Sequence, residues 1–125
     1  MNRNDTTFYI IYWFDAEVFK IGVTDRADRL RKHARTGGMA LHVIPHMTTK
    51  NEREAIRHVA YAFDRAFPDF ESAEPLLGTG GLGFTECFKV PRRHLLGATE
   101  LAFMGVRRSS ANETDKNHQA GVLHE

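Results

Sequence analysis

The sequence predicts a small α+β protein, an α/β sandwich in which helices flank a mostly antiparallel, three-stranded sheet. The chain has 125 residues, of which 42% are hydrophobic and 26% charged, as in an ordinary single soluble domain. Short aromatic and β-branched runs alternate with segments of helical periodicity. Glycines and prolines separate these segments, in the order strand, strand, helix, strand, helix, optional short strand, helix.

The first two strands are expected to form a hairpin. Residues 8–13 are mostly aromatic or β-branched, and residues 18–23 alternate in the manner of a half-buried strand. Residues 15–17 provide the turn between them. On the second strand, the period of two sends Lys20 to the face opposite its two apolar neighbours.

A helix and an edge strand come next. Thr24 or Asp25 caps the helix, and the glycines at 37–38 end it because they adopt the left-handed conformation at little cost. Residues 39–47 have the composition of a third strand. Pro45 has no amide hydrogen, so this strand is expected at an edge of the sheet or to end there.

The longest predicted helix covers residues 52–67, with Asn51 as its N-cap. Its apolar residues recur in steps of three and four, at positions 56, 59, 60, 63 and 67. Such a stripe predicts a helix that packs on the sheet. Pro68 closes this helix, and an acidic, glycine-rich loop is expected over 68–83.

A short strand over 84–90 and a helix over 92–104 complete the predicted domain. The later residues are polar, which is typical of disorder. The expected organisation is a flexible N-terminus at 1–6, one domain at 7–104 and a disordered tail at 105–125. No apolar run reaches the roughly 20 residues that span a bilayer. A single cysteine excludes a disulfide framework, so we expect a cytoplasmic protein without a membrane partner.

The net charge of +1 conceals an uneven distribution. Residues 20–65 contain ten Lys and Arg against five Asp and Glu, whereas residues 66–88 contain four acids and no Lys or Arg. A basic segment of this kind favours a nucleic-acid partner. The sequence therefore predicts a basic cleft beside an acidic flank.

Five groups of residues are candidates for chemistry because their spacing brings polar side chains together. Helical residues four positions apart lie on one face, and the lysine stands on a strand. The groups are Tyr9; Phe19-Lys20-Ile21-Gly22; Arg29 with His33; Glu54 with His58; and Glu86-Cys87-Phe88.

Over about residues 7–90, these motifs resemble the GIY-YIG nuclease domain. Thr7-Phe8-Tyr9 stands where that family has Gly-Ile-Tyr, and Phe19-Lys20-Ile21-Gly22 stands where it has Tyr-Ile-Gly. The most similar branch, in phages and bacteria, has a Lys-Ile-Gly segment, a Glu-x-x-x-His helix and a final Glu-Trp-Phe. The present chain departs from it with Cys87 in place of the tryptophan.

The resemblance implies a GIY-YIG-like fold and a metal-dependent endonuclease that cuts nucleic acid, DNA rather than RNA, with low intrinsic specificity. It implies a hard divalent cation, Mg²⁺ or Mn²⁺, as cofactor. Glu54 would bind this metal, with Glu52 or Glu86 as alternatives. The implied catalytic residues are Tyr9, Lys20, Arg29, His33 and Glu54. The residues expected to bind the nucleic-acid backbone are Arg26, Arg31, Lys32, Arg35 and His58.

Several roles and functions remain open at this point. Tyr9 would orient or deprotonate the attacking water, with His33 as the alternative base. One other function is a non-catalytic nucleic-acid-binding module on the same fold. Another is a protein-interaction subunit of a phage or mobile element that uses the acidic loop at 68–83. Because the tail is too short to read DNA, specificity would come from a homodimer or a targeting partner.

Overall fold

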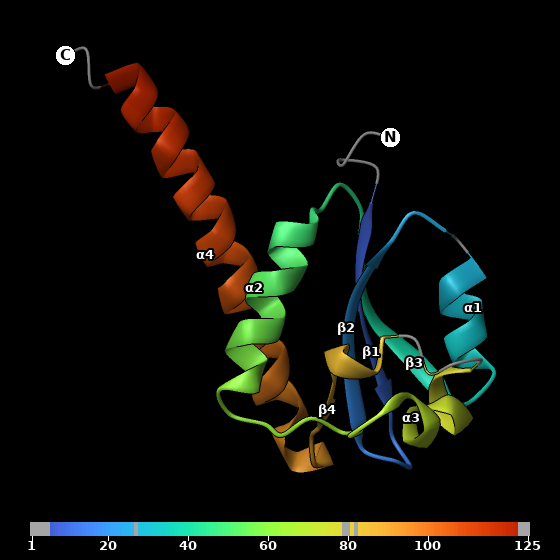
Figure 1. The fold of residues 1–125 in the computed structure, drawn as a ribbon. Helices are drawn as coiled ribbons and strands as arrows, with labels where there is room; N and C mark the ends of the chain where they lie inside the picture. The colour runs from blue at the N-terminus through green and yellow to red at the C-terminus, as the bar shows by residue number, and fades with distance from the viewer. Residues whose placement is uncertain (1–5, 27, 79–80, 82, 123–125) are drawn as a thin grey trace.

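Four strands form one antiparallel sheet with the order β3-β1-β2-β4 (Figure 1). The computed structural model describes residues 6–26, 28–78, 81 and 83–122. Within them, the strands are β1 (Thr7–Trp13), β2 (Val18–Thr24), β3 (Gly38–Ile44) and β4 (Cys87–Lys89). The α+β class is confirmed, but the predicted three-stranded sheet is wrong, because the optional last strand pairs with β2.

In the described part of the chain, four α-helices cover the two faces of this sheet. The helices are α1 (Asp28–Ala34), α2 (Thr49–Ala60), α3 (Phe70–Leu77) and α4 (Leu95–Val122). Figure 1 shows α2 and α4 on one face and α1 and α3 on the other. No helix in the described part of the chain is long and apolar enough to cross a membrane.

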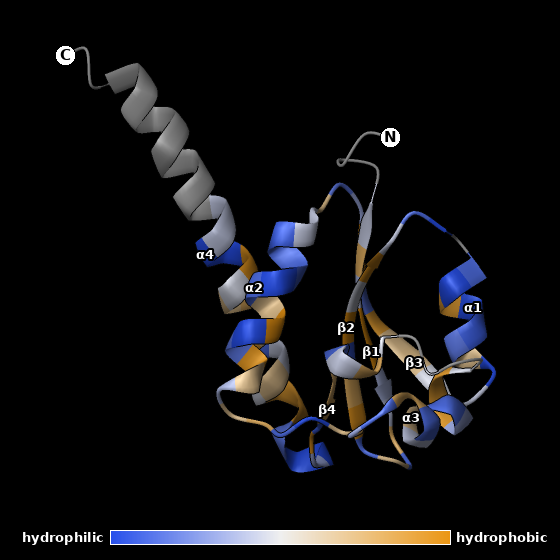
Figure 2. Cartoon of the chain, in the orientation of Figure 1, coloured by the Kyte–Doolittle hydropathy of each residue, from blue (hydrophilic) through white to orange (hydrophobic). Residues whose placement is uncertain are grey.

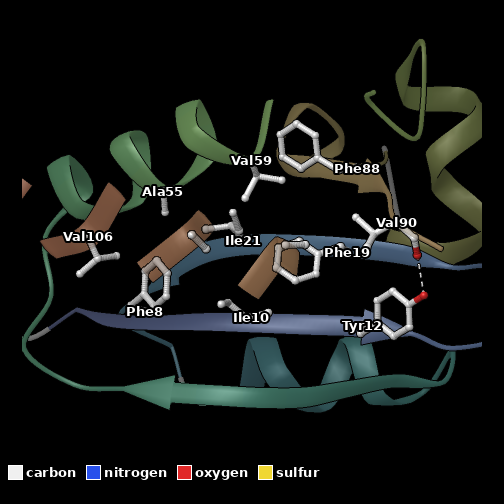
Figure 3. Packing of buried hydrophobic residues seen from close by; sticks show 12 residues of the cluster. Phe8, Ile10, Tyr12, Phe19, Ile21, Ala55, Val59, Phe88, Val90 and Val106 are labelled. Atoms are coloured by element: carbon white, nitrogen blue, oxygen red, sulfur yellow. Dashed lines mark hydrogen bonds between the residues drawn. The ribbon is translucent and has the colours of Figure 1, made fainter. Parts of the chain in front are cut away.

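The main core lies between the sheet and the α2–α4 pair. Phe8, Ile10, Phe19 and Ile21 point from the central strands toward Val59 and its neighbours on the helices (Figure 3). Figure 2 shows the corresponding band of hydrophobic residues along the strands. The packing fixes which way the alternate residues of β1 and β2 face.

Polar and aromatic residues occupy the opposite face of the same strands. In the β1–β2 hairpin Tyr9 pairs with Gly22, and across the β2–β4 pair Lys20 is opposite Cys87. Tyr9, Cys87 and Trp13 belong to a second cluster, against which Leu30 of α1 packs. The predicted placement of Lys20 away from the main core is therefore confirmed.

The predicted bounds of the long helix, 52–67 with an Asn51 cap, are wrong. Thr48 caps α2, and the Asn51 side chain bonds back to the Thr48 amide in a capping box. The helix ends at Ala60 because residues 64–66 bond along β4: the amide of Lys89 donates to Asp64 (2.8 Å) and that of Ala66 to Cys87 (2.9 Å).

The predicted loop at 68–83 contains helix α3. Asp69 caps it by accepting a hydrogen bond from the Ser72 amide at 2.8 Å. The helix was not predicted because Pro75 lies within it and glycines follow it, and both residue types are typical of loops. The third strand is an edge strand that ends before Pro45, as predicted.

The last helix continues past residue 104, so the predicted domain boundary lies inside α4. Val106 is buried in the main core. The hydroxyl of buried Ser109 accepts a hydrogen bond from the side-chain amide of Asn51 at 2.8 Å. These contacts tie α4 to α2. Apart from Thr6, the N-terminus predicted to be flexible lies outside the described residues, as do residues 123–125.

Candidate active site

The candidate site lies on β2, beside the point where its pairing with β4 ends. Strand β4 pairs only with Val18 to Lys20, so no strand among the described residues pairs with the following part of β2 on that side. The amide of Val23 there donates a hydrogen bond to Oε2 of Glu52 at 2.9 Å. Side chains from α2 and from the 3₁₀ turn at Phe84–Glu86 can therefore approach β2 beside the start of β4.

Lys20 is the centre of this site. Its side chain is only 1% exposed, and Nζ lies 2.8 Å from Oε2 of Glu86 and 3.1 Å from the hydroxyl of Tyr9. Burial alone would lower the pKa of Lys20, but Tyr9 and Glu86 outweigh it and raise the pKa above its usual value. The lysine therefore carries a positive charge against the phenol oxygen.

Glu52 supplies a second carboxylate. Burial, and then the negative charge of Glu86, raise the pKa of Glu52 to about 7, against the opposing effects of the Val23 amide and Lys20. A partly buried carboxyl whose pKa is raised by a neighbouring carboxylate marks a place that favours a cation. From the sequence, Glu52 was predicted only as an alternative metal ligand.

Glu54, the preferred ligand in the sequence analysis, faces elsewhere. Residues two apart on a helix point about 200° apart, and Glu54 pairs with Arg57 at 3.8 Å and lies 4.0 Å from His58. His58 is buried, and its Nδ1 is 2.8 Å from the backbone oxygen of Glu54. The contacts of Glu54 and His58 are thus local to α2, whereas Glu52 reaches β2.

His33 is a buried residue of α1, and its ring lies beside Tyr9. Its ring centroid lies 6.1 Å from that of Tyr9 and 5.5 Å from that of Trp13. Neither ring nitrogen has a hydrogen-bond partner among the described residues. Burial, followed by the charges of Lys20 and Arg29, lowers the pKa of His33 to about 4. The imidazole is therefore neutral at pH 7.

The basic residues of the α1 region surround a cavity of about 510 Å³. Three of the residues predicted to bind the nucleic-acid backbone contribute to its lining, Arg26, Lys32 and Arg35, together with Arg29, which was predicted as catalytic. His33 lines the same cavity. Arg31 is exposed elsewhere on α1, outside this lining.

Cys87 borders the lysine but is not a nucleophile at neutral pH. Burial, opposed by Lys20 and aided by Glu86, raises the pKa of its thiol to about 12. It is thus a buried thiol in the second hydrophobic cluster.

Sequence reasoning did not identify Gly83 as part of the site. A Cβ atom at Gly83, whose φ is 86°, would lie 3.0 Å from Nζ of Lys20 and 3.4 Å from Oε2 of Glu86. This glycine allows the chain to approach the ion pair. The signal was present as a glycine-rich run just before Glu86, but many loops share that pattern.

Gly22 makes room for Tyr9, and this gives a first prediction. A Cβ at position 22 would lie 2.4 Å from both Cζ and the hydroxyl of Tyr9. We expect Gly22→Ala to displace the tyrosine ring, weaken its bond to Lys20, and destabilise the protein by about 1–3 kcal/mol. Urea unfolding measures this change.

Gly97→Ala is the matched control, because nothing lies within 4 Å of the added Cβ on α4. In a helix, this control substitution should be neutral or slightly stabilising. Equal stability of Gly22→Ala and wild type would contradict the close packing of Tyr9 on β2.

Comparison with protein-family models, curated proteins and solved structures finds no match to this chain. The function is therefore inferred from the chemistry of the site and from the motifs.

Proposed function

We propose that the protein is a metal-dependent endonuclease that hydrolyses phosphodiester bonds of nucleic acid, DNA rather than RNA, with low intrinsic sequence specificity. The observation that carries the proposal is the convergence of Tyr9, Lys20 and Glu86, with Glu52 at the same strand edge. This cluster combines a phenol, a buried cation and two carboxylates. The resemblance to the GIY-YIG motifs supports the same reaction.

The donor atoms fit one hard divalent cation. Glu52 and Glu86 offer carboxylate oxygens, which Mg²⁺ and Mn²⁺ prefer, and one or two carboxylates suffice because such ions keep several waters. No group of three or more His, Cys, Asp or Glu side chains suited to a metal occurs among the described residues. When bound, the ion would polarise the phosphate and stabilise the leaving oxygen.

The side chains of the chain itself would perform three tasks. Arg29, on the wall of the basic cavity, would bind the non-bridging phosphate oxygens through two parallel hydrogen bonds. Lys20 would stabilise negative charge on the phenol oxygen of Tyr9, to which it donates a hydrogen bond. Tyr9 would then orient the attacking water or accept its proton.

A second candidate is a non-catalytic nucleic-acid-binding module. The burial of Tyr9, which is 1% exposed and held by Lys20, favours it, because an enclosed phenol has little access to water. The basic cavity would serve either function. Cleavage distinguishes the two.

The test of the proposal is a plasmid-nicking assay with Mg²⁺ or Mn²⁺. We expect metal-dependent nicking by the wild type and a loss of about 10²–10³-fold in Arg29→Lys, because lysine cannot form the two-pronged contact with phosphate. Arg107→Lys, an exposed arginine on α4, is the control and should cut normally. A wild type that binds DNA but never nicks it would establish the binding module instead.

The raised pKa of Glu52 predicts a pH-dependent stability in metal-free protein. The pKa is about 7 in the folded state against a usual 4.5. Below pH 4.5 both states hold the proton, and between 4.5 and 7 only the folded state does. The free energy of unfolding contributed by Glu52 therefore falls as pH rises through this window.

Glu52→Gln removes this titration while its amide oxygen can still accept the Val23 hydrogen bond. We expect the variant to match the wild type below pH 4.5 and to exceed it by about 1 kcal/mol above pH 7, a value reduced for partial solvent exposure. Urea unfolding across pH measures the difference. A constant difference at all pH values would contradict the placement of Glu52 beside Glu86.

A further inference from the structure

Apart from Arg29, the cations that line the basic cavity have no task in the proposed cleavage. Arg26, Arg29, Lys32 and Arg35 approach it from α1 and its two flanks, and none of the described lining residues is acidic. Lys32 is only loosely neutralised, by Asp28 at 3.7 Å. Figure 2 shows α1 as a largely hydrophilic helix beside the hydrophobic strands. The cavity therefore has the charge of an anion site.

One end of the cavity is closed by a chain of hydrogen bonds. Trp13 Nε1 donates to Oγ1 of Thr36 at 3.0 Å, and this hydroxyl donates to the backbone oxygen of Leu76 at 2.7 Å. Beyond this link, Thr36 and Leu76 line a separate cavity of about 120 Å³. The link joins the end of α1 to α3, so the basic cavity is blind on this side.

His33 gives the cavity an unused polar group. The side chain is 2% exposed, lines the cavity, and has two ring nitrogens without a hydrogen-bond partner among the described residues. A buried polar nitrogen without a partner costs stability. Both ring nitrogens are enclosed, so an anion in the cavity would act on His33 through its charge.

Together these features favour the binding of a doubly charged anion at the end of a ligand, such as a terminal phosphate. A phosphodiester carries one charge and continues in both directions, whereas a terminal phosphate carries up to two charges and can enter a blind cavity. The volume of about 510 Å³ lies in the range of small-ligand sites and exceeds what a lone phosphate needs. The remaining space fits the adjoining sugar.

We infer that the basic cavity beside α1 binds the terminal phosphate monoester of a nucleotide, with Arg35 and Lys32 on the phosphate. The phosphate belongs either to the end of a nucleic-acid strand or to a free nucleotide. The inference goes beyond the proposed nuclease and stands on binding alone. It names a second phosphate site, separate from the Tyr9–Lys20–Glu86 cluster.

The test is fluorescence anisotropy with the full chain in EDTA, where metal-dependent cleavage cannot occur. Short single-stranded DNA carries a 5′-phosphate, a 3′-phosphate or only hydroxyl ends. We expect one phosphorylated form to bind at least about tenfold more tightly than the hydroxyl form, as charge-assisted bonds to a dianion require. Excess inorganic phosphate should remove the preference, and sodium chloride of equal ionic strength should not.

Competition by deoxyadenosine monophosphate identifies the source of the phosphate. Competition equal to that of the oligonucleotide end assigns the site to free nucleotides, and weaker competition assigns it to strand ends. Phosphate binding should also raise the pKa of His33 from about 4, as followed by NMR of the imidazole ring.

Arg35→Ala tests the site without disturbing the core, because Arg35 is exposed. We expect it to abolish the preference for phosphate, while Arg107→Ala, which removes the same charge from α4, keeps it. Equal affinity for phosphate and hydroxyl ends, or a preference that survives Arg35→Ala, would overturn the inference. Because no cleavage is measured, an inactive nuclease would leave this result unaffected.

Discussion

Lys20→Met is expected to reduce cleavage by about 10³-fold or more while leaving a folded protein. The substitution removes the only described cation in hydrogen-bond contact with the Tyr9 hydroxyl, and loss of one pre-organised charge contact in an active site costs about 10²–10³-fold in rate. The unpaired Glu86 adds a further penalty because its charge repels the phosphate. Rates at saturating DNA measure the change.

The stability of the same variant separates a catalytic role from a structural one. Methionine fills the volume of the lysine stem, but Glu86, whose side chain is 28% exposed, loses its partner. We expect a loss of about 1 kcal/mol in the free energy of unfolding. The double variant Lys20→Met with Glu86→Gln removes the unpaired charge and should regain most of that stability.

The double variant also lacks Glu86, a proposed metal ligand, so its readout is stability alone. Lys89→Met, an exposed lysine on β4, is the matched control and should cut and unfold like the wild type. Cutting by Lys20→Met at one tenth of the wild-type rate or more would exclude a direct role for the ammonium group.

The strands could be predicted because their signals are local. The β1–β2 hairpin follows from aromatic and alternating residues, and the same alternation places Lys20 away from Phe19. Edge position follows from Pro45, which lacks an amide hydrogen. These features depend on backbone chemistry within a few residues, so one sequence is sufficient.

The helix bounds could not be predicted because distant contacts set them. The stripe of apolar residues continues to position 67, yet α2 ends at Ala60 where the chain turns to bond along β4. Helix α4 continues past residue 104 because Val106 is buried against the same core. Helical periodicity reports an apolar face but not where a neighbouring strand interrupts it.

The sequence indicated which residues would meet in the candidate site better than it indicated how those residues are oriented. Tyr9 and Lys20 meet as the motif spacing predicts, because the hairpin register places them on adjacent strands. The choice between two glutamates on α2 was not predictable, because it depends on the rotation of the helix. A Cβ at Gly105 of α4 would lie 2.3 Å from the backbone oxygen of Glu54, so the close helix contact fixes that rotation.

Glu52→Gln and Glu54→Gln form the pair of variants that decides which carboxylate binds the proposed metal ion. Both substitutions remove one negative charge from the same helix, two positions apart. Only Glu52 hydrogen-bonds to the open edge of β2 and interacts with Glu86. We therefore expect Glu52→Gln to lower metal-dependent nicking by at least about 10²-fold and to raise the concentration of Mn²⁺ needed for half-maximal rate.

Glu54→Gln should keep its rate within about threefold, because only its partly exposed pairs with Arg57 and His58 are weakened, and such pairs contribute little. Thermal unfolding with and without Mn²⁺ gives an independent readout, since a metal that binds the folded state raises Tm. That shift should vanish in Glu52→Gln and persist in Glu54→Gln. The reverse pattern would return the metal to Glu54, and would require α2 to turn by about half a revolution relative to β2. Such a rotation would break the Val23 hydrogen bond and the contact with Gly105, so the two variants test the orientation of the helix as well as the identity of the ligand.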